Sequence, residues 1–222
     1  MIHTIIFDIG GTLLRAPDLF GELANLYPGV DAIAPLRDGV LGRYHAVAEG
    51  RAPFATMEAI ISDTLREVSG MLGLPDMSCH AFDVYYQTFV TKSELFQGTI
   101  PVLDWLKSHG VNMVVASDGD HPLLQAEFKL HGIGGYFRDV FISSEVGAYK
   151  PNQAFVKALR QAVPNPEAAL SVGDSDCDVE TGKALGARTI LIGGADTPAC
   201  NPDYRIRDLS EVVEIIKQLS NS

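Results

Sequence analysis

The feature that most limits the possible fold of this chain is a short apolar run that contains a single carboxylate near its end. Residues 5–9 read Ile-Ile-Phe-Asp-Ile, and Gly10, Gly11 and Thr12 follow at once. The run is too short for a stable helix and rich in β-branched residues, so it predicts a buried strand. That strand delivers Asp8 to a tight, open loop, where we interpret it as a nucleophile. At Gly10, two positions on, a second carboxylate would be the natural acid/base partner, and there is none.

The size and charge of the chain limit the class of protein. Its 222 residues, 46% of them hydrophobic, suffice for one large domain or one domain with an insert. The formal net charge of −11 argues against nucleic acid and anionic membrane surfaces as partners, because binding to either requires a basic protein surface.

Cysteine usage and hydropathy indicate the compartment. Cys79, Cys177 and Cys200 are widely spaced and form no Cys-x-x-Cys pair, which favours neither a disulfide framework nor a zinc site. No apolar stretch approaches the ~18 residues that span a bilayer. The chain begins a strand almost immediately, without the pattern of a secretory leader. We therefore expect a cytoplasmic protein.

Strand-like and helix-like patterns alternate along most of the chain. Five apolar runs predict strands at residues 2–7, 111–116, 140–142, 169–172 and 189–192. Helical patterns follow at 101–110, 121–131, 153–163, 179–185 and 209–219. This alternation predicts an α/β protein with a doubly wound parallel sheet.

One interval breaks the alternation. About 100 residues separate the first expected strand from the second, far more than an ordinary crossover needs. The pattern from 17 to 97 is helical, with amphipathic stretches at 31–48, 56–71 and 78–90 and no convincing strand. We expect a core domain of residues 1–15 and 98–222 and an inserted helical domain of residues 16–97. The insert carries five basic and eleven acidic residues, a net charge of −6.

The expected strand ends carry the polar groups. Ligands of a parallel sheet bind beyond the carboxyl ends of its strands. Asp8 ends the first strand, Ser117 ends the second, and Lys150 lies in the connection after the third. Asp174 and Asp178 follow the fourth. We expect one crevice to hold all five side chains.

These groups suit phosphoryl transfer. Asp8 would form an aspartyl-phosphate, which divides a difficult hydrolysis into two steps. The hydroxyl of Ser117 and the ammonium of Lys150 would hold the phosphoryl oxygens. Asp8 and Asp174, with a backbone carbonyl of the first loop, offer the hard oxygen ligands that Mg²⁺ prefers. Asp178 fits a supporting role, holding a metal-bound water or Lys150.

Four motifs in this order resemble those of the haloacid dehalogenase (HAD) superfamily of hydrolases. They centre on Asp8, Ser117-Asp118, Lys150-Pro151 and Gly173-Asp174 with Asp178, and they span residues 5–178. The insert resembles the family's helical cap, and the segment 178–187 is similar to the phosphoglycolate phosphatase-like branch.

The resemblance implies a Rossmann-like core, a small phosphorylated substrate and Mg²⁺ as cofactor. The residues that it assigns fall into three groups: Asp8, Ser117 and Lys150 as catalytic; Ser117, Asp118 and Lys150 at the phosphate; and Asp8, Gly10, Asp174 and Asp178 at the metal. The contribution of Gly10 is its main-chain carbonyl.

The sequence departs from the family at Gly10. Phosphatases of this family usually carry an aspartate there, which protonates the leaving oxygen and then activates water. Such help is worth about 10²–10⁴-fold in rate. Two hypotheses follow: the substrate has a good leaving group, such as a sugar 1-phosphate, an aryl phosphate or an acyl phosphate, or another group such as Asp118 or His45 takes over.

Two alternatives remain open. A 2-haloacid dehalogenase needs no general acid, because halide departs as an anion, although dehalogenases of this family have Tyr at the position of Gly10 and use no metal. A catalytically degenerate member that binds a phosphorylated ligand or a partner protein is the non-enzymatic alternative. The sequence does not identify the substrate or the oligomeric state.

Overall fold

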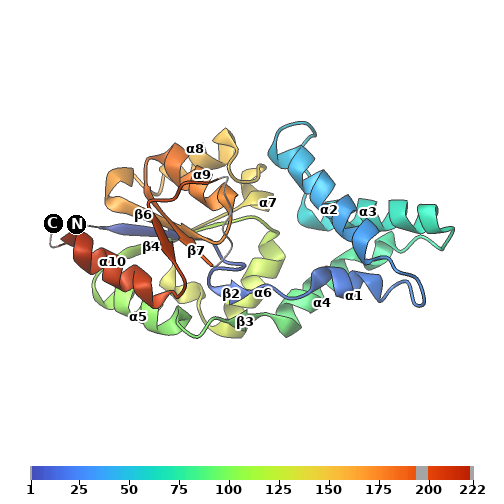
Figure 1. Cartoon of the computed structure of the whole chain (residues 1–222), viewed down its shortest axis with the longest axis horizontal. Helices are drawn as coiled ribbons and strands as arrows, with labels where there is room; N and C mark the ends of the chain where they lie inside the picture. Colours follow the sequence, from blue (N-terminus) through green and yellow to red (C-terminus); the bar gives the residue numbers. More distant parts are fainter. Residues whose placement is uncertain (1, 194–199, 221–222) are drawn as a thin grey trace.

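The computed structural model describes residues 2–193 and 200–220, and a six-stranded parallel sheet forms its centre (Figure 1). In spatial order the strands are β5 (Asp139–Ile142), β4 (Asn112–Ser117), β1 (Thr4–Phe7), β6 (Ala169–Gly173), β7 (Arg188–Ile192) and β8 (Tyr204–Ile206). Each neighbouring pair is parallel. The predicted α/β class with a doubly wound parallel sheet is confirmed.

Helices pack on both faces of this sheet. The helices α5 (Thr99–Ser108), α6 (His121–His131) and α10 (Ser210–Ser220) pack on one face, and α8 (Gln153–Arg160) and α9 (Asp176–Leu185) pack on the other. Successive strand residues point to opposite faces, so Ile5 and Phe7 of β1 join the first core, whereas Ile6 joins the second. Because both faces are covered, the strands read as continuous apolar runs.

A helical insertion lies between β1 and β4. It contains α1 (Leu19–Ala24), α2 (Ile33–Ala48), α3 (Met57–Leu72), a 3₁₀ turn (Ser78–His80) and α4 (Ala81–Lys92). The last three helices correspond to the three amphipathic stretches expected from the sequence. Leu23, Leu36, Ile61 and Leu65 are fully buried in an apolar cluster that Leu123 of α6 and Tyr149 also join. The insertion therefore packs as a helical unit beside the sheet.

One expectation about strands was wrong, and one strand was not predicted. β3 (Glu94–Leu95) lies inside the interval expected to contain no strand, and it pairs antiparallel with β2 (Leu14–Arg15). These two-residue strands are too short to show an alternating pattern, yet they bring the entry and exit of the insertion side by side. The sixth strand, β8, was also missed, because its three residues include two polar or charged side chains.

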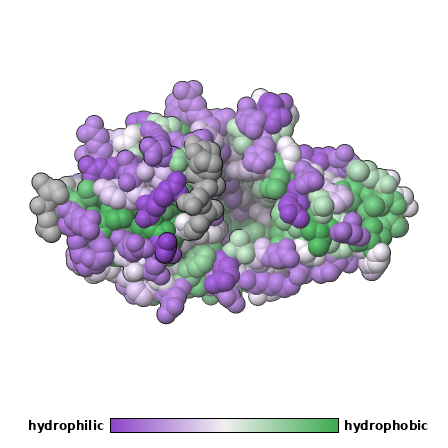
Figure 2. Space-filling model, viewed as in Figure 1, coloured by the Kyte–Doolittle hydropathy of each residue, from purple (hydrophilic) through white to green (hydrophobic). Residues whose placement is uncertain are grey.

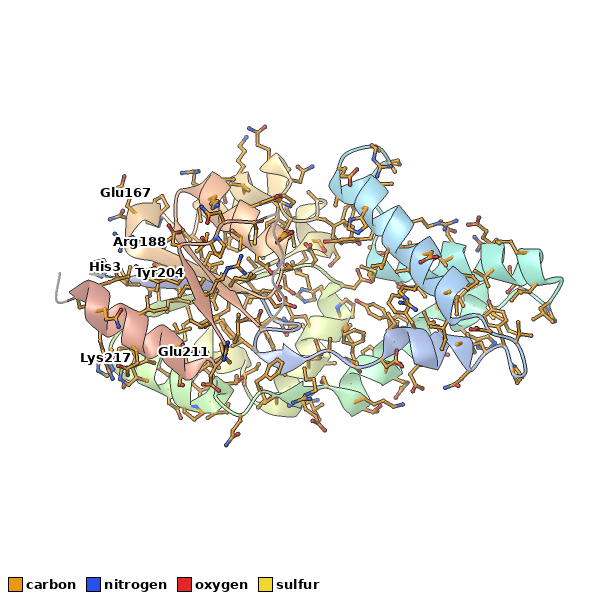
Figure 3. All side chains as sticks on the ribbon, in the orientation of Figure 1. His3, Glu167, Arg188, Tyr204, Glu211 and Lys217 are labelled. Carbon is orange, nitrogen blue, oxygen red and sulfur yellow. The ribbon has the colours of Figure 1, made fainter. Side chains whose placement is uncertain are left out.

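The carboxyl ends of the strands face the insertion. In Figure 3, His3, Glu167 and Arg188, which precede or begin β1, β6 and β7, lie at the end of the sheet remote from the insertion. Figure 2 shows apolar surface at the far tip of the insertion. Across the described residues, every helix is too short or too polar to cross a membrane.

Candidate functional site

Asp8 lies at the carboxyl end of β1, in the middle of the sheet. Its backbone N–H donates to the carbonyl of Val172 at 2.9 Å, which extends the pairing with β6 by one residue. Gly11 then adopts a φ of +80°, a left-handed conformation that glycine adopts without strain and that turns the chain away. Asp8 is buried, and burial raises the pKa of its carboxyl to about 7, while Lys150 opposes that rise.

Lys150 joins three groups at the ends of different strands. Its Nζ donates to Asp8 Oδ1 at 2.8 Å, to Asp178 Oδ1 at 2.6 Å and to the carbonyl of Ala116 at 2.9 Å. Burial lowers the pKa of this ammonium, but the Asp178 and Asp8 carboxylates more than offset burial, so the pKa lies well above its usual range. The buried cation is therefore fully paired.

Asp178 has two functions in this arrangement. Its Oδ1 accepts from Lys150, while its Oδ2 accepts from the N–H of Ser175, which caps α9. A side chain at Gly173 would meet the Asp178 carboxylate at 2.4 Å or less, so this glycine lets Asp178 lie across the end of β6. Because both carboxylate oxygens have donors, Asp178 orients Lys150 and the loop of residues 174–178.

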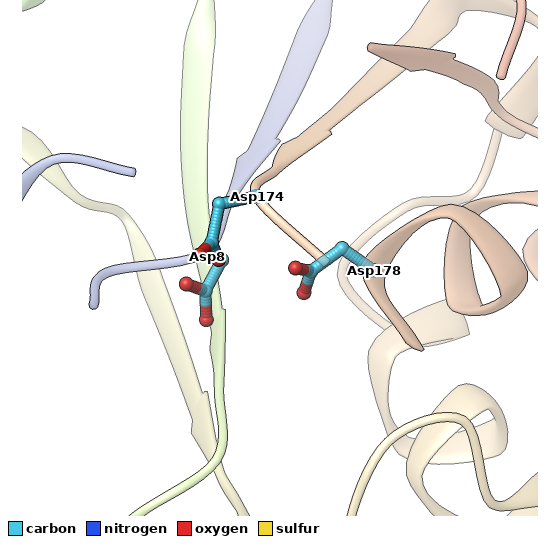
Figure 4. Close-up of side chains that lie close together, drawn as sticks. All are labelled: Asp8, Asp174 and Asp178. Atoms are coloured by element: carbon cyan, nitrogen blue, oxygen red, sulfur yellow. The ribbon is translucent and has the colours of Figure 1, made fainter. Parts of the chain in front are cut away.

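Asp174 completes a cluster of three carboxylates (Figure 4). One oxygen each of Asp8, Asp174 and Asp178 lie within 4.8 Å of one another. Asp174 is exposed toward solvent, and it approaches Gly11 so closely that a Cβ there would lie 2.2 Å from its Oδ2. Three carboxylates and one ammonium leave two uncompensated negative charges, and hard oxygen donors of this kind fit a divalent cation such as Mg²⁺.

Asp118 connects the core to the insertion. Its Oδ1 accepts from the backbone N–H of Lys150 at 3.0 Å, and its Oδ2 accepts from the hydroxyl of Tyr44 on α2 at 2.8 Å. Burial raises the pKa of Asp118, while Lys150 and Tyr44 oppose that rise. Ser117 immediately precedes it as the last residue of β4 and is buried.

Asp120 and Tyr149 make two further contacts with the insertion. The carboxylate of Asp120 accepts from the backbone N–H groups of Met57 at 3.1 Å and Glu58 at 2.8 Å, in the first turn of α3. A negative charge at a helix N-terminus is favourable. The hydroxyl of Tyr149 donates to the carbonyl of Ala55 at 2.9 Å.

All the site residues expected from the sequence line one cleft of about 600 Å³ between the sheet and α2. They are Asp8, Gly10, Ser117, Asp118, Lys150, Asp174 and Asp178. The insertion adds Tyr44 and His45 from α2, and Glu49 directly after it. A side chain at Gly10 would meet no heavy atom within 4 Å, so the position opens on free space.

Sequence reasoning missed three residues that organise this region. Tyr44 and Asp120 hold the insertion against the core, and Gly11 permits the close approach of Asp174. No local pattern marks Tyr44, because its partner lies 74 positions away. Gly11 could have been noticed, because two consecutive glycines indicate a backbone position where a side chain is not tolerated.

Comparison with known proteins agrees with this geometry. A family model described as a haloacid dehalogenase-like hydrolase matches residues 2–186. A phosphoglycolate phosphatase of Aquifex aeolicus is 26% identical over 223 residues, which cover 97% of this chain and 97% of the relative.

Solved structures agree on the fold. The L-2-haloacid dehalogenase of Xanthobacter autotrophicus superposes with a TM-score of 0.77 at 19% identity, over 98% of this chain and 99% of that one. The putative HAD-hydrolase YfnB of Bacillus subtilis, bound to magnesium, superposes with a TM-score of 0.78 at 19% identity, over 97% of this chain and 98% of that one.

Proposed function

Since the chain belongs to the haloacid dehalogenase-like hydrolase family, we propose that it is a Mg²⁺-dependent phosphatase of a small phosphorylated metabolite. One observation carries the proposal: a buried lysine holds Asp8 in place, while the carboxylate of Asp174 lies beside Asp8 and opens to the cleft. The phosphatase relative supports the choice of phosphate as the group transferred.

Asp8 acts as the nucleophile in this proposal. Its Oδ1 accepts from Lys150, which fixes the orientation of the carboxylate, and its Oδ2 has a weak contact, at 3.5 Å, with the Thr12 hydroxyl as its one side-chain hydrogen bond among the described residues. Oδ2 is therefore the oxygen that attacks phosphorus. Ser117 offers a hydroxyl to the phosphoryl oxygens, and Lys150, whose three N–H groups are taken, acts on them through its positive charge, while Asp118 holds the backbone of Lys150 in place.

The metal site comprises Asp8, Asp174 and the main-chain carbonyl of Gly10, with Asp178 as a supporting carboxylate. Mg²⁺ at this position neutralises the excess negative charge and lowers the repulsion between Asp8 and an incoming phosphate. Magnesium in the YfnB structure supports this choice of metal.

Residues 16–97 act as a cap over the cleft in this proposal, with residues 1–15 and 98–222 as the catalytic core. Three hydrogen-bonded contacts hold the cap closed: Tyr44 with Asp118, the first turn of α3 with Asp120, and Ala55 with Tyr149. In these three contacts the core partners are Asp118, Asp120 and Tyr149, which lie beside Ser117 and Lys150 in the chain, whereas Ser93 and His131 form a further contact at 3.0 Å near the exit of the insertion.

Gly10 restricts the substrate. Without a carboxylate at this position, departure of the leaving oxygen receives no proton from the first loop, so substrates with acidic leaving groups are favoured. Asp118 is a poor substitute, because its two oxygens already accept hydrogen bonds from Lys150 and Tyr44. His45 and Glu49 of the insertion are exposed and line the cleft, but the hydrogen bond from the Arg51 guanidinium holds the pKa of Glu49 below its usual range, which leaves His45 as the candidate acid from the cap.

The test is a hydrolysis screen of phosphorylated metabolites, with and without Mg²⁺, using wild-type protein and Asp8→Asn. We expect phosphate release that EDTA abolishes and that Asp8→Asn lacks. Halide release from 2-chloropropionate in the presence of EDTA would instead support a dehalogenase. No turnover of either substrate class would support a ligand-binding role.

A further inference from the structure

A second cavity adjoins the cleft beneath the insertion. It has a volume of about 200 Å³, and we call it the cap chamber. It shares Gly10, Ser117 and Asp118 with the cleft, so the two spaces meet at the phosphate position. Gly10 carries no side chain, and a Cβ there would meet nothing within 4 Å, so this position leaves space where the two cavities meet.

Most of the cap chamber's wall is apolar. Helices α1, α2, α4 and α6 contribute to it, and the side chains include Leu19, Phe20, Val40, Tyr85, Phe89 and Leu123. An apolar protein cavity of about 150 Å³ accommodates a benzene molecule. The cap chamber therefore has the size and the surface for a single aromatic ring.

Its charged groups are mainly acidic. Asp118, Asp120 and Glu127 line the cap chamber, and Arg15 is the one Lys or Arg among its described lining residues. The Arg15 guanidinium lies 5.5 Å from the centroid of the Phe96 ring, and Arg15 is exposed. Among the described residues lining the cleft, the one Lys or Arg is Lys150, which the carboxylates already occupy. A second anionic group on a substrate would find no free buried cation in either space.

We propose that the cap chamber receives the leaving group and that the preferred substrate is the phosphate monoester of an uncharged phenol. This inference rests on the proposed phosphatase function and narrows it. The expected substrate also differs from that in the name of the phosphoglycolate phosphatase relative, because the leaving group of phosphoglycolate carries a carboxylate.

The missing acid at Gly10 agrees with a phenol. Asp8 attacks phosphorus, the bond from phosphorus to the aryl oxygen breaks, and the phenolate departs with the electron pair. It then takes a proton from solvent. Water attacks the aspartyl-phosphate, releases phosphate and a proton, and restores Asp8. Phenols ionise near pH 10, as tyrosine does, so the departing anion needs little help from a general acid.

The first experiment compares four substrates in Mg²⁺ buffer: phenyl phosphate, 4-carboxyphenyl phosphate, acetyl phosphate and phosphoglycolate. We expect kcat/KM for phenyl phosphate to exceed that for 4-carboxyphenyl phosphate by at least about 10-fold, the equivalent of ~1.4 kcal/mol. Phosphoglycolate should be the poorest of the four. Equal values for the two aryl esters, or a preference for phosphoglycolate, would overturn the inference.

The second experiment places a cation in the cap chamber. Leu41 of α2 lines it and is 39% exposed, so Leu41→Arg should be tolerated. Ile33→Arg, on the same helix and 42% exposed, is the matched control and lies outside the lining. Leu41→Arg should raise the ratio of 4-carboxyphenyl to phenyl phosphate turnover about 10-fold, and Ile33→Arg should leave it unchanged.

The two proposals fail in different ways. If no substrate of the four is hydrolysed in a Mg²⁺-dependent manner, the phosphatase assignment itself is wrong. If acetyl phosphate is hydrolysed but the aryl ratio does not respond to Leu41→Arg, the phosphatase assignment stands and the cap chamber is not the site of the leaving group.

Discussion

The Nζ of Lys150 lies 2.8 Å from Oδ1 of Asp8, although the two residues are 142 positions apart in the chain. The fold produces this contact through the connection after β5, which carries Lys150 past the end of β4, where its Nζ also meets the carbonyl of Ala116, to Asp8 at the end of β1. The same ammonium also binds Asp178, and all three side chains are buried. The positive charge of one lysine therefore offsets the repulsion between two buried carboxylates.

We expect Lys150→Met to lower both stability and activity. Removing the cation leaves the carboxylates of Asp8 and Asp178 buried without a compensating positive charge, which should cost about 3–5 kcal/mol of unfolding free energy. Phosphatase activity should fall about 10²–10³-fold. Urea unfolding and steady-state kinetics measure the two effects. Lys129→Met, at an exposed position on α6, is the control and should change neither.

Gly10→Asp should increase the hydrolysis of alkyl phosphates. The position has no left-handed φ, and a Cβ there meets no neighbour, so the aspartate fits and supplies the missing acid. We expect a gain in kcat of about 10²-fold for alkyl phosphates and a smaller gain for aryl phosphates. A uniform loss across both classes would show that Gly10 is required for another reason.

Gly11→Asp is the matched control for that experiment. At a φ of +80°, with a Cβ 2.2 Å from Asp174 Oδ2, an aspartate at this position displaces the metal-binding carboxylate. We therefore expect loss of Mg²⁺-dependent activity from a glycine only one residue away.

Asp118→Asn should lower kcat/KM without moving the pH–rate profile. Both Asp118 oxygens accept hydrogen bonds, so this residue positions Lys150 and Tyr44 and does not donate a proton. The NH₂ group of the asparagine amide would face either the N–H of Lys150 or the hydroxyl of Tyr44, so one of the two hydrogen bonds is lost. This loss should cost about 1–2 kcal/mol, which corresponds to roughly 10-fold in kcat/KM. Disappearance of one limb of the profile in Asp118→Asn would identify Asp118 as the acid/base group instead.

Glu127→Gln should stabilise the protein at alkaline pH. Burial raises the pKa of Glu127 to about 7 from 4.5, with the Ser93 hydroxyl opposing that rise. The folded state therefore holds a proton between pH 4.5 and 7 that the unfolded state has lost, so stability falls as pH rises through this window. The variant should gain about 1–3 kcal/mol over wild type at pH 8 and little at pH 4.5.

Urea unfolding at several pH values measures this difference. Glu214→Gln, at an exposed site paired with Lys217, is the control and should show no such dependence. A Glu127→Gln variant that is equally destabilised at every pH would mean that the carboxyl makes a contact which the amide cannot replace.

The sequence predicted the sheet and the set of side chains that line the cleft, because both depend on local patterns. Buried strands such as β1 and β6 are apolar on both faces, and each is followed by its polar group, so Asp8 and Asp174 could be read directly. β3 and β8 gave no pattern because they are too short. Tyr44, Asp120 and Glu127 could not be found, because their roles depend on how α2, α3 and α6 pack rather than on neighbouring residues.

Covalent labelling shows whether Asp8 is the nucleophile. The protein is mixed with phenyl phosphate and Mg²⁺, quenched in acid within milliseconds, and digested for mass spectrometry. We expect one phosphoryl group on the peptide that contains Asp8, absent without Mg²⁺ and absent in Asp8→Asn. Continued hydrolysis by Asp8→Asn, or a phosphoryl group on another residue, would mean that Asp8 is not the nucleophile.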